Sequence, residues 1–291
     1  MRVATWQWGG RRHAGLMSAD GREVTPVALD PAEQADGGLA IVRRVATDRP
    51  VKPSGARLPV SAITLEAPIP RPARNIFCVG KNYHAHAREF GLSGFDSSTT
   101  SAADAVPEVP YIFTKVPESV IAPGAPIRIP SGVSEAIDYE VELAVVIGRG
   151  GARIPRSSAL DHVFGYTIVN DVTARDWQQR HKQWFLGKSF DTFCPMGPVI
   201  VSREECDGQV NVRTFVNGEK RQEAHTRDLI FDVPALIECI SQGITLQPGD
   251  VIATGTPVGV GIGFKPPKYL KRGDLVRLEI DGIGVLENPV Q

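Results

Sequence analysis

Short runs of apolar residues, bounded by turn-forming residues such as glycine and proline, recur along most of the chain. The run AIDYEVELAVVIG at 136–148 alternates apolar and acidic residues before it becomes fully apolar. Apolar runs between turn residues predict β-strands, and alternation predicts a strand with two different faces. The expected strands are 3–8, 23–28, 59–66, 76–80, 111–114, 136–147, 164–169, 211–216, 219–222, 251–253, 275–280 and 284–286.

Fewer segments have the character of a helix. The helix predicted at 232–240 has Asp232 as its N-cap and Pro234 in its first turn, where both residue types are favoured. Because strands outnumber helices and do not alternate regularly with them, the expected fold class is α+β, mainly β, and a doubly wound sheet is not expected. The other segments with helical character are 31–48, 81–91 and 172–181.

The pattern of apolar runs is interrupted by proline-rich segments before residue 75. The segment RPVKPSG at 49–55 interrupts the pattern, and the proline-rich stretch 68–75 is typical of a linker. We therefore expect a small β-rich N-terminal domain at 1–70 and a larger domain at 71–291. Residues 93–106 are small, polar and low in complexity, which indicates a mobile surface loop.

The composition argues against several classes of partner. The 291 residues carry 32 Lys and Arg against 33 Asp and Glu, so no strongly basic surface for nucleic acid is expected. No apolar run has the length of a membrane span, and MRVATWQWGGRRH has no signal-peptide core, so we expect a cytoplasmic protein without a membrane partner. The cysteines are expected to be reduced thiols, since Cys78, Cys194, Cys206 and Cys239 form no C-x-x-C pair.

Acidic residues share one face of the strand predicted at 136–147. Because side chains alternate along a strand, Asp138, Glu140 and Glu142 point the same way, with neighbours about 6.7 Å apart along the strand. Such charges repel each other unless a cation lies among them. A divalent-cation site is therefore one interpretation of this strand, and a solvated acidic face is the other.

Asp171 follows a second apolar strand and precedes a polar segment. It is either the N-cap of a helix or, at the end of the strand, a side chain that reaches into a pocket. A ligand set of carboxylates favours Mg²⁺, Ca²⁺ or Mn²⁺, and three protein ligands leave positions open for water or substrate. Zinc is not favoured, because no histidine lies near these acids in the sequence.

His86 and Glu89 are three residues apart in a segment with helical character. On a helix they share a face, and the carboxylate can orient the imidazole so that it acts as a general base. A surface helix with mixed charges is the alternative interpretation.

Some apparent motifs lack the spacing that their chemistry needs. Gly187-Lys188-Ser189 is not a P-loop, because Lys182 stands where the first glycine is required. The glycines of 259–263 are followed by Phe-Lys-Pro-Pro, which does not open a helix as a dinucleotide loop must, so a tight loop is expected there. No G-x-S-x-G supports an α/β-hydrolase.

Several segments, taken together and in this order, resemble the fumarylacetoacetate hydrolase family. They cover the chain from about residue 70 to its end, whereas the first seventy residues match only the variable N-terminal region of the family. The resemblance implies a mixed β-sandwich roll and a homodimer. The matching segments are VGKNYHAHAREFG (79–91), YIFTKVPESVIAPG (111–124), DYEVELAVVIG (138–148), GYTIVNDVTARDWQ (165–178), GKSFDTFCPMGP (187–198) and ATGTPVGVG (253–261).

The resemblance also implies roles for individual residues. Glu140, Glu142 and Asp171 match the family's ligands for Mg²⁺ or Mn²⁺. Asp138 shares their face but lies outside that set. The remaining implied residues are the catalytic His86, Glu89 and Lys188 and the substrate-binding Arg175, Gln178 and Thr256.

The reaction that the resemblance implies is metal-dependent hydrolysis of a carbon–carbon bond. The expected substrate is a small 2,4-dioxo acid, an acylpyruvate or fumarylpyruvate of aromatic catabolism, which would yield pyruvate and a carboxylic acid. Oxaloacetate decarboxylation and isomerisation or decarboxylation of a dienoate need a similar site and stay open as alternatives. A non-catalytic ligand-binding relative is the alternative from another class. The sequence leaves open the acyl group and the choice between Mg²⁺ and Mn²⁺.

Overall fold

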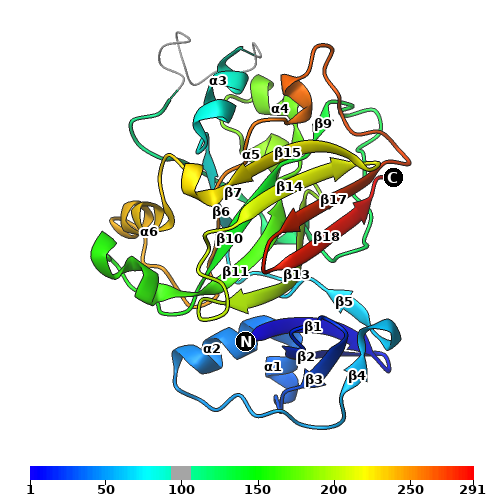
Figure 1. Cartoon of the computed structure of the whole chain (residues 1–291), viewed down its shortest axis with the longest axis vertical. Helices are drawn as coiled ribbons and strands as arrows, with labels where there is room; N and C mark the ends of the chain where they lie inside the picture. Colours follow the sequence, from blue (N-terminus) through cyan, green and yellow to red (C-terminus); the bar gives the residue numbers. More distant parts are fainter. Residues whose placement is uncertain (93–105) are drawn as a thin grey trace.

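A large mixed sheet runs through most of the computed structural model, which describes residues 1–92 and 106–291 (Figure 1). β5 (Thr64–Glu66) pairs with β1 (Arg2–Trp8), and β8 (Val120–Ile121) pairs with β13 (Cys194–Ser202), off the main path of this sheet. The main path, in order, is β4 (Leu58–Pro59), β3 (Glu23–Pro26), β2 (Arg11–Met17), β1 (Arg2–Trp8), β13 (Cys194–Ser202), β11 (Val163–Asn170), β10 (Val141–Ile147), β16 (Val251–Ala253), β6 (Ile76–Gly80) and β7 (Tyr111–Lys115).

A second, antiparallel sheet packs across the first, with β10 lying against β14 (Asn211–Val216) and β11 against β17 (Leu275–Ile280) (Figure 1). This arrangement confirms the expected mainly β, α+β fold. A short ladder joins β9 (Ile137–Asp138) to β12 (Thr173–Ala174). The strands of the second sheet are, in order, β15 (Glu219–His225), β14 (Asn211–Val216), β17 (Leu275–Ile280) and β18 (Gly284–Pro289).

The described helices are short. The helix predicted at 232–240 is observed as α6 (Val233–Ser241), and the side chain of Asp232 accepts a hydrogen bond from the amide of Ala235, as expected of an N-cap. None of the described helices has the length and apolar character needed to cross a membrane. The helices are α1 (Pro31–Asp36), α2 (Gly38–Ala46), α3 (His84–Leu92), α4 (Arg175–Arg180), α5 (Phe185–Lys188) and α6 (Val233–Ser241), with 3₁₀ turns at Val60–Ala62, Pro117–Ser119, Arg156–His162, Thr226–Asp228 and Gly261–Gly263.

The two faces of β10 pack against different cores. Leu143 and Val145 lie in the core between the two sheets. Ala144 and Val146 face the opposite side, in a core that includes Leu39 of α2. Glu142 lies on the same face of β10 as Ala144 and Val146, because side chains alternate along a strand. Its carboxylate is therefore directed away from the core between the sheets.

The single strand predicted at 136–147 is wrong in one respect, because it is interrupted at Tyr139 and Glu140. The amide of Glu140 donates to the side chain of Asn170 at 3.0 Å instead of joining the regular ladder. Residues before the interruption pair with β12, and those after it pair with β11. The interruption thus lies at the acidic residues themselves.

The sequence pattern does not predict β2 or β13. β2 is rich in charged residues, and β13 contains Pro195 and Pro198, which are rare inside sheets. β1 pairs with β13 through Arg2↔Val201 and Val3↔Ile200, so the N-terminal strands extend the main sheet. The domain boundary near residue 70 stays a prediction, and the loop predicted at 93–106 falls, except for its last residue, outside the described residues.

Candidate functional site

Three buried carboxylates converge where two neighbouring strands meet. Val141 pairs with Asn170 in the β10–β11 ladder, and the amide of Asp171 donates to the carbonyl of Glu140 at 2.9 Å. This register places Asp171 beside Glu140 and Glu142. One oxygen from each of the three carboxylates lies within 4.8 Å of the others. Asp171 is not a helix N-cap, because α4 begins only after Ala174.

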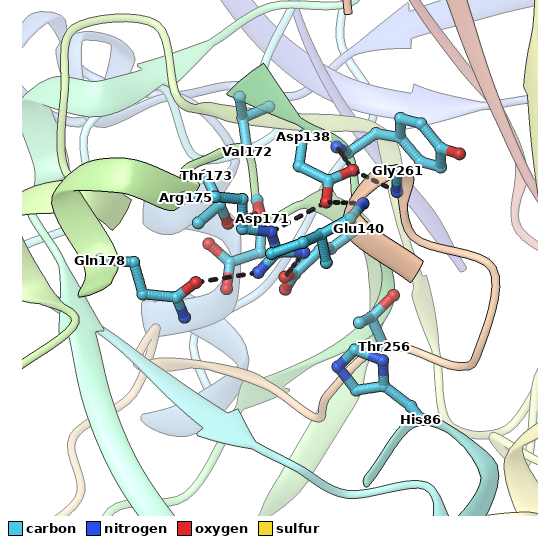
Figure 2. A network of polar contacts seen from close by, with 12 residues as sticks. His86, Asp138, Glu140, Asp171, Val172, Thr173, Arg175, Gln178, Thr256 and Gly261 are labelled. Carbon is cyan, nitrogen blue, oxygen red and sulfur yellow. Dashed lines mark hydrogen bonds and ion pairs between the residues drawn. The ribbon is translucent and has the colours of Figure 1, made fainter. Parts of the chain in front are cut away.

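A row of buried side chains with alternating charge passes through this cluster. Nε of Arg175 donates to Oδ2 of Asp138 at 2.8 Å, and its Nη2 lies 2.7 Å from Oε1 of Glu140 (Figure 2). Asp138 also accepts from the amides of Gly261 and Ile262, at 2.6 and 3.0 Å. In order, the row is Asp138, Arg175, Glu140, Lys188, Asp171 and Lys115.

Lys188 joins two of the three carboxylates. Its Nζ lies 2.8 Å from Oε2 of Glu140 and 2.7 Å from Oδ2 of Asp171. Burial raises the pKa of Glu140, but Lys188 and Arg175 outweigh burial and leave that pKa below its ordinary value. Burial lowers the pKa of Lys188, whereas Asp171 and Glu140 raise it, and the net change is upward. Both groups are therefore held in their charged forms.

Glu142 differs from its neighbours because no cation of the described residues lies within ion-pair distance of it. Its hydrogen-bond partner is the amide of Gly255, at 2.8 Å. Burial and the charges of Asp171 and Glu140 raise the pKa of Glu142 well above its ordinary value. A divalent cation would remove this imbalance, so the cluster fits such an ion, with Glu140, Glu142 and Asp171 as the residues that would hold it.

His86 and Glu89 form a hydrogen-bonded pair on α3. Nδ1 of His86 lies 3.1 Å from Oε2 of Glu89, which leaves Nε2 for other partners. The carboxylate of Glu89 also accepts from the amide of Gly259 at 3.0 Å. The ring of His86 lines the same pocket as Glu140 and Glu142.

The glycine-rich loop after β16 supplies backbone donors to the acidic side chains around the pocket. Gly255, Gly259 and Gly261 donate their amides to Glu142, Glu89 and Asp138, respectively. Such fixed amide donors stabilise buried carboxylates. The tight loop expected at 259–263 is therefore observed, and it helps to build the site.

The pocket is a small cavity of about 20 Å³, which is about the room that one water molecule or cation needs. Aromatic rings of Phe90, Phe113 and Trp184 form one wall of it. Trp184 and Phe113 also line a surface groove of about 470 Å³.

The comparison with family models decides the classification, since the fumarylacetoacetate (FAA) hydrolase C-terminal model matches residues 75–291. The chain belongs to the fumarylacetoacetate hydrolase family. It is 52% identical to oxaloacetate tautomerase YisK of Bacillus subtilis over 79% of this chain and 74% of that protein. It is 42% identical to mitochondrial oxaloacetate tautomerase FAHD2A of Bos taurus over 96% and 87% of the two chains.

A solved structure of the family covers the whole chain. The fumarylacetoacetate hydrolase of psychrophilic Exiguobacterium antarcticum superimposes with a TM-score of 0.85 and 40% identity, over 100% of this chain and 99% of that one. The expected family fold is thus confirmed, and the protein is an enzyme of this family with a buried acidic cluster that fits a divalent cation. The type of reaction is a separate question.

The structure of this fumarylacetoacetate hydrolase family member brings the predicted catalytic and substrate-binding residues to one pocket, except Glu89, which lies behind His86. Arg175 and Gln178 lie one turn apart on α4, and Nη1 of Arg175 donates to Oε1 of Gln178 at 3.1 Å (Figure 2). The hydroxyl of Thr256 accepts from Nε2 of Gln222 at 2.8 Å. Residues of the predicted sets that line the pocket are His86, Glu140, Glu142, Arg175, Gln178, Lys188 and Thr256.

Sequence reasoning missed several residues of this family site. Lys115 lies at the end of an apolar strand, and a charged residue in that position was the available signal. Trp184 lies in a polar segment, and nothing in the pattern predicts its place over the pocket. Gly80 allows its close packing, because a Cβ at Gly80 would lie 2.1 Å from the indole ring. The pocket-lining residues that sequence reasoning missed are Val79, Gly80, Lys81, Phe90, Phe113 and Trp184.

Replacing Gly263 by alanine is expected to lower the enzyme's turnover number by about tenfold to a hundredfold without changing its Mn²⁺ affinity. A Cβ at Gly263 would lie 2.1 Å from Oε1 of Glu89, so the carboxylate must leave the position in which it bonds His86. Steady-state kinetics and an Mn²⁺ titration measure the two effects. Gly243→Ala is the matched control, because nothing lies within 4 Å of a Cβ at that position. Wild-type turnover in Gly263→Ala would show that the placement of Glu89 does not matter.

Proposed function

We propose that this protein is a divalent-cation-dependent tautomerase that interconverts the keto and enol forms of oxaloacetate. The observation that carries the proposal is His86, which Glu89 holds by a hydrogen bond and which lines the same pocket as Glu140, Glu142, Lys188 and Arg175. The reaction moves a proton between C3 and the C2 oxygen and breaks no carbon–carbon bond. Two relatives that cover most of this chain are named for this activity.

The acidic cluster supplies the electrophilic half of the proposed reaction. Glu140, Glu142 and Asp171 would hold Mg²⁺ or Mn²⁺, which would supply Lewis-acid polarisation of the C2 carbonyl and so make the C3 protons more acidic. Lys188 adds a fixed positive charge at the same place. These charges favour a substrate with a carboxylate next to its carbonyl, which is a 2-oxo acid.

His86 supplies the proton-transfer half. With Nδ1 engaged by Glu89, Nε2 is the nitrogen that can take a proton from C3 of the substrate and deliver it to the C2 oxygen, and the same transfer runs backwards from enol to keto form. Glu89 fixes the orientation of the ring, and the amide of Gly259 fixes Glu89. Arg175 and Gln178 are proposed to contact the substrate carboxylates from the opposite wall.

Hydrolysis of an acylpyruvate is the second candidate, because the same imidazole can activate a water molecule for attack at C4. The structural relative from Exiguobacterium antarcticum carries the name of a hydrolase. The relatives named as oxaloacetate tautomerases favour the oxaloacetate chemistry that the sequence left as an alternative. The homodimer implied by the family stays a prediction.

A substrate panel tests the proposal. Enol oxaloacetate, keto oxaloacetate, an acylpyruvate and fumarylpyruvate are each supplied with Mg²⁺ or Mn²⁺ and then with a chelator. We expect cation-dependent acceleration of keto–enol exchange, followed by ultraviolet absorbance, with pyruvate release at least about a hundredfold slower than the exchange.

Each other outcome of the panel assigns a different function. Faster release of pyruvate from the acylpyruvate or fumarylpyruvate would identify a hydrolase. Pyruvate and CO₂ from oxaloacetate would identify a decarboxylase. If the protein binds the cation but turns over none of the four substrates, the binding-protein alternative is favoured.

A further inference from the structure

A second lysine, Lys115, lies behind the acidic cluster at the end of β7. Its side chain is completely buried, and it is not among the residues that line the pocket. Its Nζ donates to Oδ1 of Asp171 at 2.7 Å and to the carbonyl of Val172 at 3.1 Å. It also donates to the backbone carbonyl of Lys188. Lys115 therefore reaches the site only through its neighbours.

These contacts use all the donors of the ammonium group and connect parts of the site that are far apart in sequence. Asp171 and Val172 follow β11, whereas Lys188 is the last residue of α5. The ammonium group of Lys115 thus holds both the carboxylate of Asp171 and the backbone of Lys188. The side chain of Lys188 reaches the other oxygen of Asp171, Oδ2, at 2.7 Å.

The division of the two oxygens of Asp171 has a chemical consequence. Oδ1 is occupied from behind by Lys115, while Oδ2 lies on the side shared with Lys188 and Glu140. Because Lys115 holds Oδ1, Oδ2, which also accepts from Lys188, is the oxygen of Asp171 left on that side for a cation. Partners of this kind that orient metal ligands commonly change metal affinity by about 10- to 100-fold when removed.

We propose that Lys115 is a positioning residue that holds Asp171 as a one-oxygen ligand and fixes the backbone of Lys188 behind the cation site. The proposal rests on the cation site of the proposed function. It makes no use of the identity of the substrate, so it applies equally to a tautomerase, a decarboxylase or a hydrolase.

The sign of one measurement separates positioning from simple charge balance. Lys115 is a positive charge next to a proposed cation ligand, so its charge alone repels a divalent cation. If Lys115 acts only through charge, Lys115→Met should bind Mn²⁺ more tightly than the wild type. If Lys115 positions Asp171, the same substitution should weaken binding, because the carboxylate loses its fixed orientation.

Mn²⁺ titration followed by electron paramagnetic resonance gives both the affinity and the spectrum of the bound ion. For Lys115→Met we expect affinity to fall by about tenfold or more, with an altered bound-ion spectrum and a smaller increase in Tm on adding Mn²⁺. Lys52→Met, at an exposed lysine, is the matched control and should equal the wild type. Unchanged or tighter binding with an unchanged spectrum would overturn the proposal.

A second variant covers the case in which Lys115→Met does not fold. Lys115→Arg keeps the positive charge but replaces the ammonium group, which donates three hydrogen bonds, by a planar guanidinium. Positioning therefore predicts a weaker Mn²⁺ affinity, and charge balance predicts an unchanged one. Equal Mn²⁺ binding by a folded Lys115→Arg protein overturns the proposal. Failure of the wild type to bind Mn²⁺ would remove the cation site itself. A negative substrate panel with Mn²⁺ bound would overturn only the proposed reaction.

Discussion

Replacing Glu142 by glutamine is expected to abolish saturable Mg²⁺ and Mn²⁺ binding and to reduce oxaloacetate tautomerisation by about a thousandfold. Cation catalysis of this type is worth several kcal/mol, and about 4 kcal/mol corresponds to a thousandfold change in rate. Glutamine keeps an oxygen that can accept from the amide of Gly255, which now bonds Glu142 at 2.8 Å. The substitution therefore removes the charge while leaving the local packing nearly intact.

The same variant should be more stable than the wild type when no cation is present. The folded-state pKa of Glu142 is raised well above its ordinary value, so the folded protein binds this proton more tightly than the unfolded chain does. The associated stability is present at a pH below the ordinary carboxyl pKa of 4.5 and is lost as pH rises through the higher folded-state value. Glutamine carries no titrating proton, so the folded Glu142→Gln protein does not lose this stability as the pH rises.

Urea unfolding in chelator across neutral and mildly acidic pH measures this effect, and titration calorimetry measures cation binding. Glu118→Gln is the control, because its side chain is 53% exposed. Wild-type Mn²⁺ affinity in Glu142→Gln would exclude Glu142 as a ligand. A fall in stability of the metal-free variant at neutral pH would contradict the electrostatic account of this residue.

Replacing His86 by glutamine should lower keto–enol exchange by about 10²- to 10⁴-fold, which is the usual contribution of a positioned general base. Cation affinity should change little, because the cation would be held by Glu140, Glu142 and Asp171. Both variants should thus lose keto–enol exchange, but only Glu142→Gln should lose cation binding. Exchange of the C3 hydrogens of oxaloacetate with deuterium from solvent reports the proton-transfer step directly.

His84→Gln is the matched control for His86, since His84 is an exposed histidine on the same helix. Glu89→Gln should give an intermediate loss of exchange, because glutamine orients the imidazole less well than a carboxylate does. If His86→Gln keeps the wild-type exchange rate, then another group moves the proton and the assignment of the base is wrong.

The local sequence pattern predicts many of the strands and helices. It fails for strands whose place depends on pairing with distant parts of the chain. Leu143 and Val145 alternate with Ala144 and Val146, and the two sets face the two cores that alternation predicts. The prolines of β13 argue against a central strand, yet β13 lies between β1 and β11. Its place depends on partners more than twenty residues away, and no local propensity contains that information.

The candidate site shows the same division. The spacing of Glu140 and Glu142 and the position of Asp171 after a strand indicated a cation cluster, and the structure brings the three side chains together. Nothing in the spacing indicated that Glu140 and Asp171 share Lys188 while Glu142 has no cationic partner among the described residues. Ion pairing depends on side chains from separate elements, so the imbalance that favours a cation appears only in three dimensions.

The sequence by itself determined the mainly β class, the alternating acidic residues at 138–142 and the family resemblance that implied a cation site there. Only the tertiary structure decided how the charges are paired, because β7, β11 and α5 meet through the fold and not along the chain. Lys115 illustrates the reason. A lysine at the end of an apolar strand has no assigned role until Asp171 and the backbone of Lys188 are folded against it.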